Sequence, residues 1–341
     1  MKHILNKLMN QENLTIEEMK NATNQCFEQE TTDAEISAFL TSLRIKGETA
    51  DEMAGMVDII RSQSELSEIE LAHVSDNCGT GGDQSNSFNI STTTAFVLAG
   101  AGVKIAKHGN RSISSKTGSA DVLEELGVSL TFSKTHTENL LQENNITFLF
   151  APHVHAKLRP FMKIRQELGL PTIFNLIGPL TNPINLETQL MGVYQRDKLE
   201  TIAEALKKLG RKRAIVMNGA EHMDEASLAG DNHLVLLDNG NISSFTVHPY
   251  DLGLPVYNNQ DIQGGTAKEN AAILQSVLNN ETSPYLDTVL LNAAIGLFAH
   301  GQVHTLIDGI EMARESIASG KAKERLTTLV EYSQSVSKEA I

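Results

Sequence analysis

The chain has 341 residues, and 28 Lys and Arg stand against 42 Asp and Glu, which gives a formal net charge of −14 at pH 7. This charge argues against non-specific binding of nucleic acid, which depends on a basic surface. With 40% hydrophobic and 21% charged residues, the composition is typical of a globular protein, and the length predicts two domains.

The cysteines and the N-terminus indicate the compartment. Only Cys26 and Cys78 are present, and they are far apart and lack metal-binding spacing, so neither a disulfide framework nor a zinc site is predicted. The first twenty residues are polar, and the longest run of apolar residues and glycine, 95–103, is too short to span a bilayer. We therefore expect a cytoplasmic protein.

The first seventy residues carry the signals of a small helical bundle. Two apolar stripes have helical spacing, Ile36 to Leu43 and Met53 to Ile60, and Gly47 between them can end a helix. Thr-x-x-Glu capping boxes predict three helix starts: Thr15 to Glu18, Thr32 to Glu35, and Thr49 to Glu52.

From about residue 73, short strands and helices alternate, which predicts a mostly parallel sheet covered on both faces. The predicted strands are 73–78, 103–106, 147–150, 214–217, 234–237 and 244–248. The predicted helices are 91–99, with Ser91 as its cap, 120–126, 197–209, 268–278 and 287–334. Residues 160–190 contain four prolines, so we predict an irregular hinge or crossover there.

A glycine-rich loop, Gly79 to Asp83, lies between a predicted strand and a predicted helix, where α/β folds bind phosphate. The 84–120 segment that follows has no Asp or Glu, although about four or five are expected from the composition. An ordinary glycine turn is the alternative. The spacing matches neither G-x-G-x-x-G nor the Walker pattern, so neither a nicotinamide cofactor nor ATP is predicted.

A second polar loop, 107–115, follows the next predicted strand. Lys107 and Arg111 can act as phosphate cations, and Ser112, Ser114 and Ser115 can donate hydrogen bonds. A solvated basic turn would have a similar composition. Because neighbouring parallel strands end at one edge of a sheet, we expect the two loops to lie together.

Two further groups could carry chemistry. Asp224 and Glu225 follow the predicted strand 214–217 through a polar loop, and carboxylate oxygens suit Mg²⁺. The alternative is that they are simply two adjacent exposed acids. A basic cluster follows the strand that ends at Phe150. It contains an arginine, Arg165, that could bind a carboxylate through both its terminal nitrogens, or could be a surface cation; the cluster is His153, His155, Arg159 and Arg165.

Taken together, these motifs resemble the anthranilate phosphoribosyltransferase family of tryptophan biosynthesis. The resemblance covers nearly the whole chain and is carried by residues 79–92, 107–127, 172–183, 223–225, 292–301 and 318–322. It implies transfer of the phosphoribosyl group of phosphoribosyl pyrophosphate to anthranilate. It also implies a helical domain, 1–72 with a contribution from about 166–190, and an α/β domain, 73–165 and 191–341, as in the nucleoside phosphorylase and phosphoribosyltransferase class.

The resemblance assigns residues to each ligand. Arg165, with Asn110 and Gly79, would bind anthranilate, and His108 would border the reaction centre. Ser91, Asp224 and Glu225 would hold Mg²⁺, two ions per subunit. The residues expected to bind phosphoribosyl pyrophosphate are Gly79, Gly82, Asp83, Ser87, Asn89, Ile90, Ser91, Thr92, Lys107, His108, Gly109, Asn110, Arg111, Ser112, Ile113, Ser114, Ser115 and Ser119.

The chain departs from the family pattern at several positions. Gln84 stands where the family usually has Gly, and Pro171 where it usually has Arg; 156–158 and 218–223 also differ. A pyrimidine-nucleoside phosphorylase of the same fold is the rival enzyme, and a nucleic-acid-binding relative is the rival outside enzymes. The helical N-terminus could form a homodimer interface, although its apolar stripes also suit an internal core.

Overall fold

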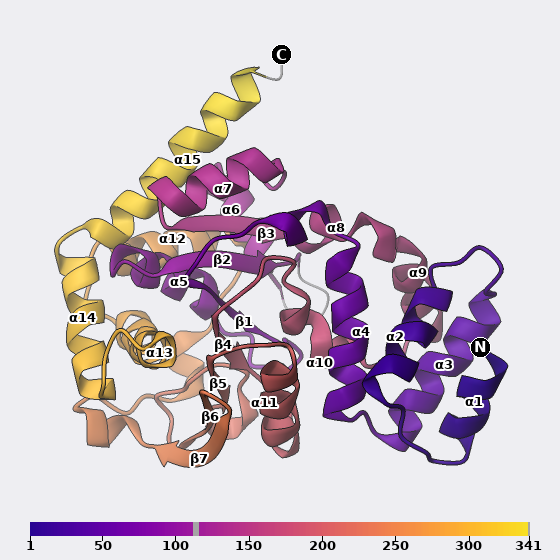
Figure 1. Ribbon diagram of the computed structural model, residues 1–341. Helices are drawn as coiled ribbons and strands as arrows, with labels where there is room; N and C mark the ends of the chain where they lie inside the picture. Colours follow the sequence, from indigo (N-terminus) through magenta and orange to yellow (C-terminus); the bar gives the residue numbers. More distant parts are fainter. Residues whose placement is uncertain (112–115, 340–341) are drawn as a thin grey trace.

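The computed structural model describes residues 1–111 and 116–339, and it places a helical bundle beside a larger α/β region (Figure 1). The bundle begins with α1 (Lys2–Met9), α2 (Ile16–Gln25), α3 (Asp33–Lys46) and α4 (Ala50–Ser62), and the short helix η1 (Glu65–Glu68) follows. All three predicted capping boxes are present, at the starts of α2, α3 and α4. In each, the threonine hydroxyl accepts from the glutamate N–H and the glutamate carboxylate accepts in return, so the prediction of helix here is confirmed.

The segment 160–190 does cross between the bundle and the sheet, as predicted, but most of it is helical, so the expectation that it would be irregular was wrong. Pro160 lies in the first turn of a regular helix, where its missing N–H costs no hydrogen bond, and Gly169 caps the helix end. The segment contains α9 (Arg159–Leu168), α10 (Phe174–Ile177), η3 (Gly178–Thr181) and the start of a strand at Thr188, and it follows α8 (Ala151–Val154) and η2 (Ala156–Leu158).

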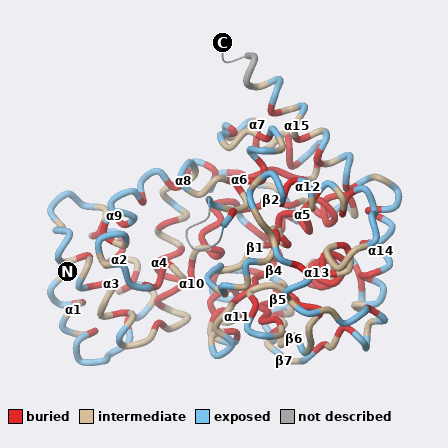
Figure 2. The backbone as a smooth tube through the Cα atoms, turned by 180° about the vertical axis from the view of Figure 1, so that it is seen from behind, coloured by how far each residue is buried: buried red, intermediate tan, exposed pale blue. Residues whose placement is uncertain are grey.

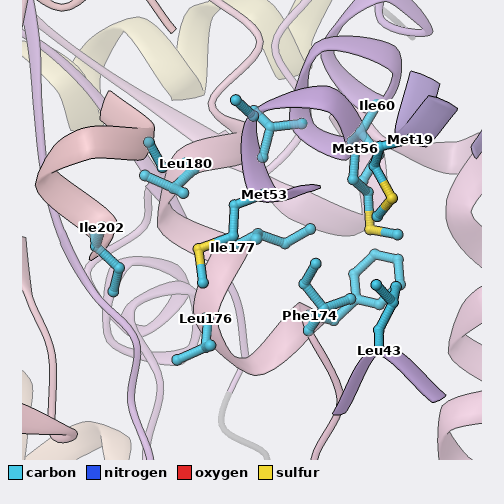
Figure 3. Packing of buried hydrophobic residues seen from close by; sticks show 14 of the residues in the cluster. Met19, Leu43, Met53, Met56, Ile60, Phe174, Leu176, Ile177, Leu180 and Ile202 are labelled. Carbon is cyan, nitrogen blue, oxygen red and sulfur yellow. The ribbon is translucent and has the colours of Figure 1, made fainter. Parts of the chain in front are cut away.

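One hydrophobic core joins the bundle to this segment and to α11 (Leu199–Lys208). Figure 3 shows Met53 of α4 close to Ile177 and Leu180, and Ile202 of α11 beside them. An ion pair of 2.8 Å between Lys208 and Asp51 closes the edge of the same contact between α11 and α4. The bundle is therefore packed against the α/β region, not tethered to it by a linker alone.

The described residues form one sheet with the order β3-β2-β1-β4-β5-β6-β7. The ladders from β3 to β5 are parallel, and β6 and β7 are antiparallel, so the sheet is mixed but mostly parallel. The strands are β1 (Val74–Gly79), β2 (Lys104–Gly109), β3 (Ile146–Phe150), β4 (Thr188–Gly192), β5 (Arg213–Asn218), β6 (Asn232–Asp238) and β7 (Asn241–Val247). Strand β4 was not predicted, although it pairs with β1 at the centre of the sheet.

Successive residues of the central strands face opposite cores, as the strand period requires. In β4, Leu190 faces the core beneath α13, whereas Met191 faces α11 and the bundle. The tube in Figure 2 accordingly shows the central strands mostly buried. The covering helices are α5 (Ile90–Gly100), α6 (Ser119–Glu125), α7 (Lys134–Glu143), α12 (Ala267–Leu278), α13 (Pro284–His300), α14 (Leu306–Ala318) and α15 (Lys321–Glu339).

Two helix predictions need correction. The long predicted helix 287–334 is three helices, α13 to α15, broken after His300 and after Ala318. Ser91 does not cap α5, because that helix begins at Ile90 with Asn89 as its N-cap. Helix α7 was not predicted. Within the described residues, no helix is both long enough and apolar enough to cross a membrane.

Candidate active site

The carboxyl ends of β1 and β4 form the floor of the candidate site. Gly79 and Gly192 are partners in the register of these parallel strands, and the chain then leaves the sheet on both sides. A side chain at either glycine would overlap Asp224, at its carboxylate above Gly79 and at its carbonyl oxygen above Gly192. Two glycines in register therefore make the seat for Asp224, and this is the close approach that glycine permits.

The loop after β1 folds over this seat. The N–H of Gly81 donates to the Asp224 carboxylate at 2.6 Å, and the N–H of Asp224 points at the Asp83 carboxylate at 3.4 Å. Gln84, at the position where a glycine was expected, has φ 60°, in the left-handed region that favours glycine. The substitution thus keeps the glycine-like backbone, at a cost in strain.

The N-terminus of α5 points into the site from the other end of this loop. Asn89 makes no cap hydrogen bond, because its side chain accepts from Asn270 at 2.7 Å and donates to the Thr117 carbonyl at 3.3 Å. Two of the first backbone N–H groups of the helix are already engaged: that of Ile90 donates to the Phe88 carbonyl at 2.7 Å, and that of Ser91 donates to the Glu225 carboxylate. The partial positive charge of the helix start therefore acts on Glu225 and on any anion bound beside it.

Asp224 and Glu225 are brought into a half-buried acidic cluster with Asp83. Burial, followed by repulsion from Asp83 and Glu225, raises the pKa of Asp224 well above its ordinary value. Burial also raises the pKa of Glu225, to about 7, although the charge of Lys107 and hydrogen bonds from Ser91 oppose the rise. The alternative that Asp224 and Glu225 are simply two exposed acids is therefore excluded.

This donor set fits a magnesium ion that is completed by substrate oxygens. In the part of the chain that the structure describes, no group of three acidic, histidine or cysteine side chains is arranged as a complete metal site. Mg²⁺ usually binds through one or two carboxylates plus substrate phosphates, so an incomplete protein set is what such an ion needs. A divalent cation here would also offset the repulsion that raises both pKa values.

Lys107, expected from the sequence to be a phosphate cation, points into the protein and not into a solvated turn. Its ammonium is buried, and it donates to the Asn77 carbonyl at 2.7 Å and to the Ser91 hydroxyl at 3.2 Å. It is thus an internal cation beside Ser91 and Glu225, and its charge already acts on Glu225.

The rest of the second loop is only partly described. The Arg111 guanidinium forms ion pairs of 2.8 Å with Asp121 and Glu124 of α6, so this cation is already engaged. The Ser119 hydroxyl donates to the Asn110 carbonyl at 3.3 Å and ties the loop to α6. The predicted contacts of Ser112, Ile113, Ser114 and Ser115 lie outside the described residues.

His108 and His155 meet edge to face beside β2, with ring centroids 5.4 Å apart. Burial lowers the pKa of His108 to about 3, with further contributions from His155 and Lys107, and burial lowers the pKa of His155 to about 4. Both rings are therefore neutral near pH 7. His108 can accept a proton or a hydrogen bond, but it is a weak base.

Among His153, His155, Arg159 and Arg165, it is Arg165 whose surroundings suit the binding of a ligand. Its guanidinium lies 5.1 Å from the ring centre of Phe174, and burial lowers its pKa. Among the described residues, no acidic side chain forms an ion pair with Arg165; its nearest polar contact is Met162 Sδ at 3.5 Å. A half-buried guanidinium that stacks on an aromatic ring and lacks a carboxylate suits an anionic aromatic ligand.

Sequence reasoning missed the contribution of β4 and of residues 262–270. Tyr194, just beyond β4, is the side chain nearest to Gly82. The backbone of 262–264 pairs with the loop that follows β1. The Phe88 N–H donates to the Ile262 carbonyl at 3.1 Å, and the Gly264 N–H donates to the Asn86 carbonyl at 2.9 Å. Strand β4, Thr188–Gly192, is only five residues long, and the prolines that precede it suggested irregular chain. No sequence signal identified it as a strand, and only its pairing in the sheet did.

Comparisons with known proteins agree with one another over the whole chain. Residues 71–323 match the family model described as glycosyl transferase family, a/b domain, and residues 2–64 match the helical bundle domain of the same family. The chain is 54% identical over 337 residues to the anthranilate phosphoribosyltransferase of Oceanobacillus iheyensis, covering 99% of both chains. It is 57% identical over 334 residues to that of Exiguobacterium sibiricum, covering 98% of both.

Solved structures give the same result. The anthranilate phosphoribosyltransferase of Thermus thermophilus superposes with a TM-score of 0.91 at 35% identity, covering 97% of this chain and 99% of that one. The Saccharomyces cerevisiae enzyme, solved in complex with phosphoribosyl pyrophosphate and Mg, superposes with a TM-score of 0.89 at 28% identity, covering 98% and 97%. The expected two-part architecture, a helical bundle beside a mostly parallel α/β region, is confirmed.

Proposed function

We infer the activity of this chain from its family: it belongs to the anthranilate phosphoribosyltransferases. It transfers the phosphoribosyl group of phosphoribosyl pyrophosphate to the amine of anthranilate, giving N-(5'-phosphoribosyl)anthranilate and pyrophosphate in tryptophan biosynthesis. The pyrimidine-nucleoside phosphorylase alternative is not favoured, because the relatives that match nearly the full chain are transferases.

The observation that carries this function is the seat of Asp224 between two glycines, with Glu225 beside it. A half-buried pair of acids with raised pKa values is costly unless a cation shares the site. Ser91, Asp224 and Glu225 would hold Mg²⁺, and we propose two ions per subunit. Mg²⁺ bound there supplies positive charge to the pyrophosphate as a leaving group.

The phosphate-binding roles stay with the residues expected from the sequence. The loop from Gly79 to Asp83 would offer the backbone N–H groups of Gly82 and Asp83 to the pyrophosphate, because those of Thr80 and Gly81 are already bonded to Gly192 and Asp224. The start of α5 would add its partial positive charge. Lys107 acts from inside, through Ser91 and Glu225, and not as a direct surface contact. Arg111 would have to leave Asp121 and Glu124 before its side chain could meet a phosphate.

Arg165 would orient anthranilate by its carboxylate, with Asn110 and Gly79 nearby. An aromatic amine is not protonated near neutral pH and needs no strong base before it attacks the ribose carbon. The low pKa of His108 agrees with that requirement, so we assign it a bordering role. Catalysis then rests on positioning the amine and on stabilising the departing pyrophosphate.

The activity is tested with purified protein, phosphoribosyl pyrophosphate, Mg²⁺ and anthranilate, by following the loss of anthranilate fluorescence. We expect the loss to require all three additions. If anthranilate persists while phosphate cleaves uridine or thymidine, the phosphorylase function replaces this one.

Three further proposals concern the whole molecule. We propose domain bounds of 1–72, with a contribution from about 166–190, and of 73–165 with 191–341, and a cytoplasmic location. We also propose a homodimer through the helical domain, since Met9, Ile45, Met162 and Leu170 leave large apolar side chains exposed on or beside it. Sedimentation of the wild type and of Ile45→Lys tests this: a monomeric wild type would refute the dimer.

A further inference from the structure

The loop that carries Asp224 and Glu225 has no sheet ladder to hold it. It begins after β5 at Asn218 and reaches β6 only at Asn232. Two consecutive residues before the acids, Glu221 and His222, have φ of 59° and 64°, in the left-handed region. Such a backbone persists only where its surroundings determine it.

The side chain of Asn292, in a helix far along the chain, hydrogen-bonds to this loop at Ala226, the residue directly after the two acids. Asn292 lies in the middle of α13, and its Oδ1 accepts the N–H of Ala226 at 3.0 Å while its Nδ2 donates to the Ala226 carbonyl at 2.9 Å. The second Nδ2 hydrogen goes to the Thr288 carbonyl, one turn back, at 2.9 Å. The amide thus pairs with Ala226 as a neighbouring strand would, and the Thr288 bond fixes which way it faces.

The position of Asn292 in its helix is unusual for a polar residue. Its neighbours Leu291 and Ala293 are fully buried, and Asn292 itself is 1% exposed. A buried amide is costly unless it is hydrogen-bonded, so this residue is tolerated because the loop uses it. Asn292, Glu225 and Ser91 lie around the same narrow gap in the packing, so the contact with Ala226 is close to Glu225.

The hydrogen bonds from Asn292 to Ala226 must hold the loop against electrostatic repulsion. The N–H of Asp224 points at the Asp83 carboxylate at 3.4 Å, and Glu225 is the next residue, so three carboxylates lie close together in the site. Their like charges repel one another and push the loop that carries Asp224 and Glu225 away from the loop that carries Asp83. Helix α13 packs against β4, which with β1 forms the floor of the site, and also against β5 and α5. An anchor on α13 therefore fixes the acids relative to that floor.

We propose that Asn292 is a positioning residue for the acidic pair: it holds Ala226, and through it Asp224 and Glu225, at the spacing that Mg²⁺ and pyrophosphate require. The proposal deepens the proposed function and rests on it. The hydrogen bonds of the Asn292 amide go to the backbone of Ala226 and Thr288, so it acts through the loop, and its effect should appear in metal dependence and not in anthranilate binding.

The test compares wild type with Asn292→Ala and the milder Asn292→Ser. Two quantities are measured: the Mg²⁺ concentration that half-saturates anthranilate consumption, and the Mg²⁺ dependence of thermal stabilisation by inorganic pyrophosphate, which needs no turnover. Loss of a group that orients metal ligands typically weakens metal binding about 10- to 100-fold. We expect both half-saturating concentrations to rise by about that factor, with KM for anthranilate changed by less than about twofold.

Asn144→Ala is the matched control. Asn144 is also 1% exposed and its Nδ2 donates to the Arg325 carbonyl at 2.9 Å, at the end of α7 and away from the acids. It should lower thermal stability without moving the Mg²⁺ dependence. An unchanged Mg²⁺ dependence in both Asn292 variants, or an equal shift in Asn144→Ala, overturns the proposal. A wild type without Mg²⁺-dependent transfer overturns the proposed function instead.

Discussion

Replacing Arg165 with Ala should raise KM for anthranilate far more than KM for phosphoribosyl pyrophosphate. The guanidinium is half-buried, stacks on Phe174 and has no acidic partner among the described residues, so its hydrogen-bonding capacity is open to a ligand. A hydrogen bond to a charged group contributes about 1.5–3 kcal/mol, and a carboxylate can accept two from one guanidinium. Allowing for non-additivity, we expect a loss of about 2–4 kcal/mol, or about 30- to 1,000-fold in KM.

The assay is steady-state anthranilate fluorescence with each substrate varied in turn. Arg159→Ala is the control, because Arg159 begins the same helix but is exposed. Arg165→Lys should fall between wild type and Arg165→Ala, since it keeps the charge and loses the planar fork. Equal increases of both KM values in Arg165→Ala, or an effect as large in Arg159→Ala, would refute the assigned contact.

Four other substitutions test the rest of the site. Asp224→Asn with Glu225→Gln should abolish turnover and leave thermal stability equal or higher, because it removes half-buried like charges; Mg²⁺-dependent turnover in that variant would contradict the metal assignment. Gly192→Ala should lower both activity and melting temperature by displacing Asp224, and an active, stable variant would contradict the seat. Gln84→Gly should raise the free energy of unfolding in urea by up to about 1 kcal/mol by relieving the left-handed backbone, and no gain would mean that the strain is absent. Burial holds the pKa of His155 at about 4, below its ordinary 6.5, so protons favour the unfolded chain and stability is lost as pH falls through that range. Compared with His155→Phe, the wild type should lose about 1–2 kcal/mol more between pH 6.5 and 5, whereas parallel urea curves would contradict the shift.

The helical bundle and the motif loops were predictable because their signals are local. A capping box is written in four consecutive residues, and the boxes at Thr15, Thr32 and Thr49 all formed as the sequence predicted. A glycine loop between a strand and a helix is likewise a local pattern. The family resemblance added the order of separated motifs, which identified the activity before any geometry was known.

Strand β4 and helix α9 could not be predicted with the same means. The β4 run is five residues long, and a run this short has no periodicity that separates a strand from other buried chain. Prolines near α9 suggested a break, yet Pro160 stands where a helix tolerates it. In both cases tertiary packing, with β1 for the strand and with the bundle for the helix, decided the outcome.

The amino-acid sequence by itself determined which chemical groups this protein carries: acids that suit a metal, glycines and a helix N-terminus that suit phosphate, and an arginine that suits a carboxylate. Only the tertiary structure decided what those groups face. Lys107 turned inward to Ser91, Arg111 paired with α6, and Asp224 settled between Gly79 and Gly192. The physical reason is that residue type fixes charge and hydrogen-bonding capacity, whereas burial and partners depend on chain segments far apart in the sequence, as the hold of Asn292 on Ala226 shows.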